Sequence, residues 1–265
     1  MDDSRDDEKR RYELCRTGFG FLSAALILAC LTAFLALPAV FLNGQIFIPW
    51  IHDPAVWFWI ETPIVWGSLM GSYLLWGRWS EPSWQRRTGL LVVMCMVDAL
   101  LWLVKHAPEL GLHKESVGHF WLRINLGEAL GWAEFALLAS LACEMMSHLG
   151  VTQADEAGQS TRSLAATGAS LFMVLFCLRT DWARGWPLQD RPMLSVSLRL
   201  LSLGELMIQT ITLIQVTALV IAAARQCGAA IKTITLEEAR EEVWRGPGDE
   251  GGFADESFPN RPRSS

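Results

Sequence analysis

The chain has 265 residues, of which 51% are hydrophobic and 19% are charged, and its mean hydropathy is +0.26. A soluble domain carries about 25% charged residues and spreads its apolar residues periodically, whereas this chain gathers them into long blocks. The composition therefore excludes a soluble enzyme, a disordered chain and a small disulfide scaffold. The net charge of −6 provides no basic stripe for phosphates, so nucleic acid is not an expected partner.

Several apolar blocks are long enough to cross a membrane, which takes about 20 residues in a helix. The fold class expected is all-α, a polytopic transmembrane helix bundle. The fourth block carries several charges and the fifth is short, so five crossings is the alternative to six. The first block is longer than the apolar part of a signal peptide, and a retained signal anchor is expected. The six predicted spans are residues 18–42, 55–77, 89–106, 120–148, 163–179 and 195–224.

The distribution of Lys and Arg predicts the orientation, because cytoplasmic loops carry an excess of both. Basic residues gather in segment 1–17, in the loop after the second span and after the sixth span, while segment 43–54 has none. Both termini are therefore expected in the cytoplasm, which requires an even number of crossings. Arg184 and Arg191, in the last outer loop, weaken the bias. Short loops without glycosylation sequons favour a bacterial cytoplasmic membrane.

The segments outside the spans are polar. Residues 1–17 are expected to form a cytoplasmic tail with mixed charges. Residues 225–245 are predicted to be a cytoplasmic amphipathic segment. Within it, Thr235 to Trp244 is expected to form a short helix in which Thr235 is the N-cap and Glu238 closes a capping box. Residues 246–265 are rich in Gly, Pro, Ser and acids, so a disordered tail is expected there.

Acidic residues inside the spans are the main functional signal. A charge at the bilayer centre costs about 2.5–3.5 kcal/mol on insertion scales, so it normally faces protein or water and has a partner. Four of these residues lie at a similar expected depth, about 9–15 Å below the outer surface, and are predicted to share one polar layer. They are Glu61, Asp98, Glu128 and Glu205, and a further acid, Glu134, lies in the fourth span.

Helical spacing places polar residues on the same faces as these acids. Such one-sided stripes indicate a polar interior rather than exposure to lipid. The supporting polar residues are Ser68, Asn125, Ser202 and Gln209, and the basic residues expected to balance the charge are Arg123, Arg199 and Lys105.

Two glycine pairs predict close packing of the second and fourth spans. Gly67 and Gly71 lie one turn apart, as do Gly127 and Gly131. Small residues at this spacing allow helix backbones to approach each other in a membrane. Both spans are therefore expected inside the bundle.

Three functions fit this pattern. The first is translocation of an ion, a proton or a small solute through the carboxylate cluster. The second is a non-catalytic scaffold or assembly subunit whose ion pairs are purely structural. The third is an intramembrane enzyme that uses the carboxylates as acid and base. The sequence contains no HExxH, G-x-S-x-G or P-loop motif and no histidine deep in a span, so neither a metal nor a cofactor is expected. The expected partners are the lipid bilayer, a cation or small solute, and another copy of the chain or another membrane protein.

Overall fold

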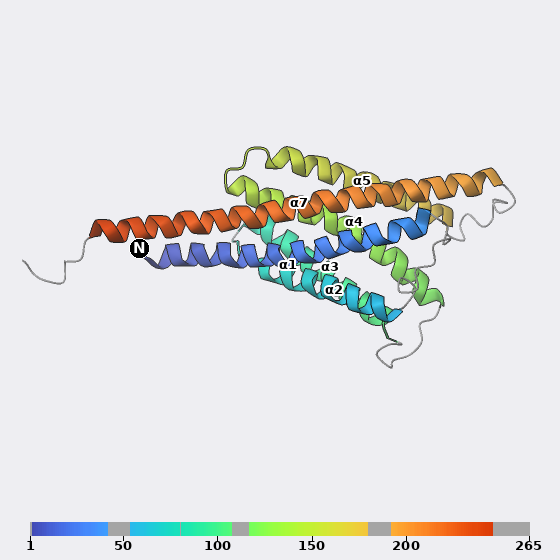
Figure 1. Ribbon diagram of the computed structural model, residues 1–265, viewed down its shortest axis with the longest axis horizontal. Helices are drawn as coiled ribbons and strands as arrows, with labels where there is room; N and C mark the ends of the chain where they lie inside the picture. The colour runs from blue at the N-terminus through green and yellow to red at the C-terminus, as the bar shows by residue number, and fades with distance from the viewer. Residues whose placement is uncertain (1, 42–53, 80, 108–116, 180–191, 246–265) are drawn as a thin grey trace, which may run out of the picture.

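The computed structural model describes residues 2–41, 54–79, 81–107, 117–179 and 192–245, and all regular structure in these ranges is helical (Figure 1). The predicted disordered tail, residues 246–265, lies outside them. The helices are α1 (Asp2–Phe41), α2 (Pro54–Leu75), α3 (Pro82–Lys105), α4 (Val117–His148), α5 (Ala154–Arg179) and α7 (Pro192–Arg245).

Within the described residues, five helices are long and apolar enough to cross a membrane: α1, α3, α4, α5 and α7. The chain is therefore a multi-pass membrane protein by composition and helix length. The fourth and fifth spans, which the sequence left in doubt, are both among the five. Of the described helices, α2 is not among these five candidates. Glu61, Pro63 and three tryptophans lower its hydropathy.

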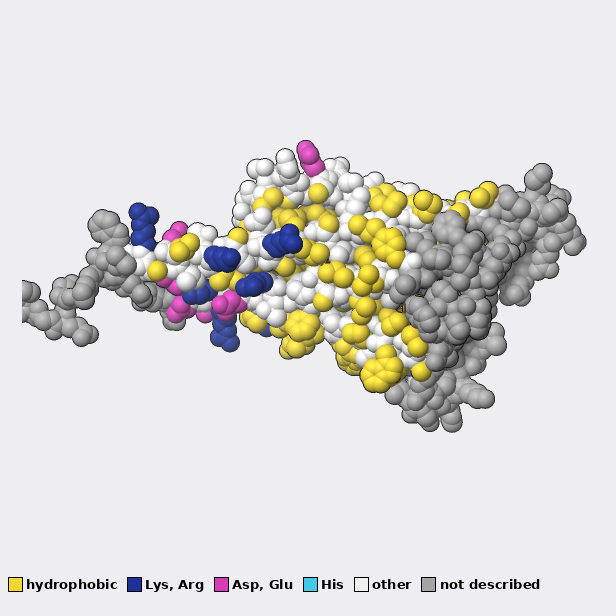
Figure 2. Space-filling view, viewed as in Figure 1, with side chains coloured by type: hydrophobic (Ala, Val, Ile, Leu, Met, Phe, Trp, Pro, Cys, Tyr) yellow, Lys and Arg dark blue, Asp and Glu magenta, His cyan; other side chains and the backbone are white. Residues whose placement is uncertain are grey.

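The helices close a ring. In this ring α1 contacts α2, α2 contacts α3, α3 contacts α4, α4 contacts α7, and α7 contacts α1 again. Helix α5 packs outside the ring, against α4 and α7. On the face shown in Figure 2, hydrophobic side chains cover the body of the bundle, and charged side chains gather on the protruding end of α1 and α7. Leu31, Val93 and Leu100 are each more than half exposed, as expected of side chains that face lipid.

The close approach predicted at Gly67 and Gly71 is confirmed for α2. A Cβ atom at Gly71 would lie 2.7 Å from the carbonyl oxygen of Gly18 in α1, and one at Gly67 would lie 3.4 Å from the Cβ of Ala25. These glycines let the two backbones touch, as small residues do in membrane helix pairs. The contact places α2 directly beside the apolar part of α1.

The same prediction is wrong for α4. No described atom lies within 4 Å of a Cβ built at Gly131. The tight contact of α4 lies on α5 instead, where Gly168 receives the indole ring of Trp132 and Gly158 receives the Cys143 side chain. Spacing alone identified small residues but did not show which of them faces a neighbouring helix.

The ends of the chain form an antiparallel pair of helices. Arg5 bonds to Glu241 at 2.7 Å and Lys9 to Glu238 at 2.9 Å, so the start of α1 lies beside the end of α7 (Figure 1). The prediction of a separate helix capped by Thr235 is wrong. The helix α7 runs unbroken to Arg245, and the Thr235 hydroxyl donates to the Ile231 carbonyl one turn earlier. Residues 2–17 likewise continue α1 rather than forming a separate tail.

We expect Gly71→Ala to destabilise the bundle by about 1–3 kcal/mol, because the new methyl group would overlap the backbone of α1. Thermal unfolding of the purified protein in detergent measures the loss. The control is Gly20→Ala, since no described atom lies within 4 Å of its Cβ position. Equal melting temperatures for the two variants would contradict the contact.

Candidate functional site

A cavity of about 400 Å³ lies inside the helix ring, lined by residues of α1, α2, α3, α4 and α7. Its walls are mostly apolar, and they include the aromatic side chains of Trp57 and Phe135. Two acidic residues line it, Asp98 on α3 and Glu134 on α4. The other polar residues on its lining are Thr32, Ser68, Gln209 and Thr210.

Small side chains create the space. Ala25, Ala29 and Ala33 recur every fourth residue on α1, so they form a single stripe that faces the cavity. Gly131 adds a further gap on α4, because nothing fills the position of its missing Cβ. With larger residues at these positions the helices would fill the volume with side chains, as packed interiors do.

The carboxyl groups of Asp98 and Glu134 are partners in this cavity. A hydrogen bond between them needs a proton on one of the two, because an ionised carboxylate can only accept. The buried Glu134 carboxyl group also interacts with the Cys95 thiol on the same lining. Its oxygen Oε1 has no hydrogen bond of ordinary geometry within the described residues. Two ionised carboxylates side by side repel strongly away from water. The pair therefore needs a shared proton or a bound cation.

The described walls of the cavity do not balance the charge of the acid pair. None of the described residues that line it is Lys, Arg or His. Gln209 and the hydroxyl groups are neutral, so they cannot neutralise a carboxylate. Among the residues that the structure describes on this lining, none therefore compensates the negative charge of the pair.

Glu61 has a different environment, at the far end of α2 and α3 from the chain termini. One carboxylate oxygen accepts a hydrogen bond from Lys105, and the other lies 3.1 Å from His106 Nε2. His106 is buried, and the rings of Phe58 and Trp102 lie 5.2 and 5.4 Å from its own. Glu61 is thus neutralised by its neighbours and joins α2 to α3.

The remaining predicted residues do not meet at one point. Glu205 is buried, with 4% of its surface exposed, but it does not line the cavity, and Glu128 does not line it either. Ser68 and Gln209 do line it, whereas Asn125 and Ser202 do not. The side chains of Arg123 and Arg199 lie outside the described residues. Asp98 is therefore the only one of the four predicted carboxylates on the described lining.

Glu134 lies in the fourth predicted span but outside the predicted polar layer. It lies about 9 Å further along its helix than Glu128, so its expected depth was different. The helical face of Glu134 could have identified it. Gly131 and Glu134 are three residues apart on α4, so a small residue that leaves space lies beside the carboxylate.

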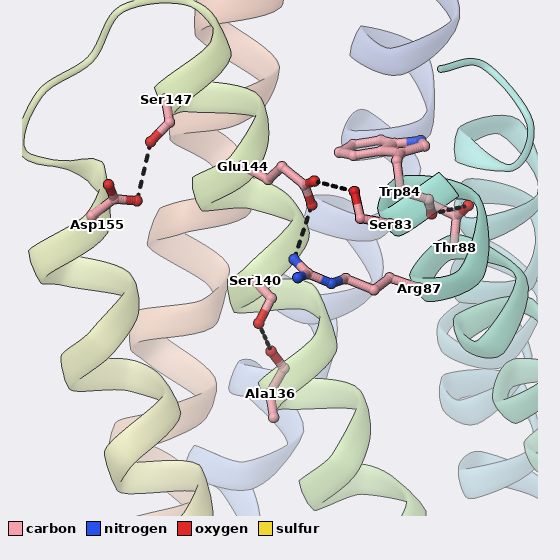
Figure 3. Close-up of polar contacts among 9 residues, drawn as sticks. All are labelled: Ser83, Trp84, Arg87, Thr88, Ala136, Ser140, Glu144, Ser147 and Asp155. Carbon is pink, nitrogen blue, oxygen red and sulfur yellow. Dashed lines mark hydrogen bonds and ion pairs between the residues drawn. The ribbon is translucent and has the colours of Figure 1, made fainter. Parts of the chain in front are cut away.

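A second polar cluster joins α3 to α4 near the charged end of the bundle (Figure 3). The Glu144 carboxylate bonds to Arg87 at 3.0 Å and accepts a hydrogen bond from Ser83 at 3.2 Å. A smaller pocket of about 280 Å³ adjoins this cluster, and Glu144, Trp84 and His148 are among the residues that line it. Because Arg87 neutralises Glu144, we interpret the cluster as a structural clamp.

Comparison of the chain with protein-family models, with curated proteins and with solved structures gives no match.

We expect Glu61→Gln to lower stability by about 1–2 kcal/mol, because it removes the charge that Lys105 and His106 bind. The value is modest because the pair is only partly buried: the Lys105 and Glu61 side chains are 33% and 24% exposed. Thermal unfolding in detergent measures the change. The matched control is Glu81→Gln, an exposed residue whose side chain makes no capping hydrogen bond at the start of α3. A control that loses as much stability as Glu61→Gln would disprove a specific role for the pair.

Proposed function

We propose that this multi-pass membrane protein translocates a proton or a small cationic solute through the cavity in its helix ring. One observation carries the proposal: Asp98 and Glu134 face each other in a cavity whose described lining has no cationic side chain. Intramembrane carboxylates in such positions mark ion and proton pathways. The chemistry required is reversible charge exchange, in which a cation and a proton replace each other on the pair.

Release of a cargo requires a wall that can move, and α2 supplies one. Pro63 has no backbone N–H for the carbonyl of Trp59, so the helix lacks a hydrogen bond at this level. Trp57, Ile64 and Val65 on either side of the proline line the cavity. We propose that α2 bends at Pro63 to open the cavity, because a broken helix is easier to bend than a continuous one.

The topology that we propose has six crossings, with α2 as the second. This helix packs on α1 and α3, and it exposes Trp59, Met70 and Tyr73 where lipid would lie. The pairing of Arg5 with Glu241 supports an even count, since it holds both ends of the chain on one side. The excess of Lys and Arg favours the cytoplasmic side, and a bacterial cytoplasmic membrane remains the proposed location.

Labelling tests this topology. We expect Arg11→Cys and Arg240→Cys, both exposed positions, to react with a membrane-impermeant maleimide from the same side of sealed vesicles. A background without native cysteines prevents other labelling. Disrupted vesicles provide the total signal. Labelling of the two positions from opposite sides would exclude an even number of crossings.

Flux measurements test the function itself. We expect Asp98→Asn and Glu134→Gln each to reduce proton or cation flux into proteoliposomes at least about tenfold, because each removes a group that exchanges charge. The matched control is Glu144→Gln, on the same helix as Glu134 but outside the cavity, which should keep its flux. Absence of flux in the wild-type protein, or wild-type flux in both cavity variants, would refute translocation.

A scaffold function is the second candidate. The observation that favours it is the neutralised cluster of Glu61, Lys105 and His106, which joins two helices without leaving a charge unmatched. Buried ion pairs of this kind serve packing specificity in some proteins. On this alternative, the wild-type protein and the two cavity variants all show only background flux, and a second copy or another membrane protein co-purifies.

A further inference from the structure

We infer that the cargo of the cavity is an organic ammonium ion with an apolar body, such as a lipophilic primary amine, rather than a proton or a metal ion. The inference rests on the proposed function and names its substrate class. Three properties of the cavity carry it: its size, its walls and the kind of hydrogen bond that its polar groups offer.

The size of the cavity fits an organic molecule. Pockets for small organic ligands occupy about 300–1,000 Å³, and this one occupies about 400 Å³. A hard cation such as Ca²⁺ takes about six to eight oxygen ligands at close range. Among the described residues, no group of three or more His, Cys, Asp and Glu side chains is arranged to hold a metal ion.

The walls fit an apolar body. Ala25, Ala29 and Ala33 line one side, and Ile64 and Leu213 line others. A hydrated metal ion would gain nothing from these surfaces, because they cannot replace its water ligands. An alkyl or aryl group that enters the cavity loses contact with water and packs against them.

The charge of the pair fits a single ammonium group. Asp98 and Glu134 that share one proton keep one negative charge, which one monovalent cation neutralises. Glu134 Oε1 makes no hydrogen bond of ordinary geometry within the described residues, so it can accept one from an N–H group. Trp57 and Phe135 provide aromatic rings on the same lining, and such rings attract ammonium ions through their faces.

The threonines on the lining favour a cargo that donates hydrogen bonds. The Thr32 hydroxyl donates to Ala29 and the Thr210 hydroxyl to Leu206, each at 2.8 Å within its own helix. Their protons are therefore used, and each oxygen offers only lone pairs to the cavity. Together with the carboxylates they form a set of acceptors that suits an ammonium group and disfavours an anion.

Binding of two matched probes tests the inference. We expect 2-phenylethylamine, which is a cation at neutral pH, to bind the wild-type protein in lipid nanodiscs at least about tenfold more tightly than 2-phenylethanol, its neutral analogue of similar shape. Isothermal titration calorimetry measures both affinities. This comparison uses the wild-type chain, so it does not depend on how any variant folds.

Variants then locate the binding site. We expect the double variant with Asp98→Asn and Glu134→Gln to bind the amine no more tightly than the alcohol, and Phe135→Leu to weaken the amine more than the alcohol. The control Glu144→Gln should bind both probes as the wild type does. An alcohol that binds as tightly as the amine, or amine binding unchanged in the double variant, would overturn the inference.

The flux assay separates this inference from the proposed function. Flux of protons, Na⁺ or K⁺ that requires both carboxyl groups, together with no amine binding, would refute the ammonium cargo and leave translocation standing. If the protein neither transports nor binds any of these cations, both the translocation function and the ammonium cargo are refuted. Amine binding and amine uptake that are lost together in the double variant would support both.

Discussion

The cost of moving charge out of water controls the polar architecture of this bundle. An ionised group in hydrocarbon needs a partner, a proton or a polar cavity. Glu61 obtains two partners, Lys105 and His106, at the far end of α2 and α3. Within the described part of the chain, Asp98 and Glu134 contact each other and the Cys95 thiol, and no cationic side chain lines their cavity. A carboxyl group thus joins two helices at one level of the bundle, whereas at another level two carboxyl groups face a cavity whose described lining has no cation.

Packing explains why the cavity survives between these helices. Tight contacts hold the bundle elsewhere: Gly18 and Gly71 join α1 to α2, and the Trp132 ring lies on Gly168 of α5. Membrane helices associate through such close packing because lipid provides little hydrophobic drive between them. Because these contacts fix the spacing of the helices, the short alanine side chains on α1 do not reach the opposite wall. A cavity of about 400 Å³ therefore remains beside the acid pair.

Much of the fold followed from the sequence, because apolar length alone identifies membrane helices. The same pattern could not show that α7 continues to Arg245, since that depends on pairing with α1 through Glu238 and Glu241. At the site, depth along each helix selects Asp98, which lines the cavity, but it favours Glu128 over Glu134, and Glu134 is the one on the lining. Depth is a one-dimensional measure, whereas the partner of a side chain is decided by helix rotation and by which neighbour packs on that face. The basic residues show the same limit: Lys105 could be placed near a helix end, but its bond to Glu61 depends on how α2 and α3 align.

The acid pair also bears on how a cargo would be coupled to protons. In an apolar cavity the pair is stable with one shared proton, or with a cation, but not with two negative charges and nothing between them. A second proton would neutralise the pair and remove its attraction for a cation, so protonation and cation binding oppose each other on the same two side chains. On the proposed function, a cation that enters from one side can be expelled by a proton that enters from the other. The exchange then follows from electrostatics in the cavity, and it needs from the protein only a wall that opens to each side in turn.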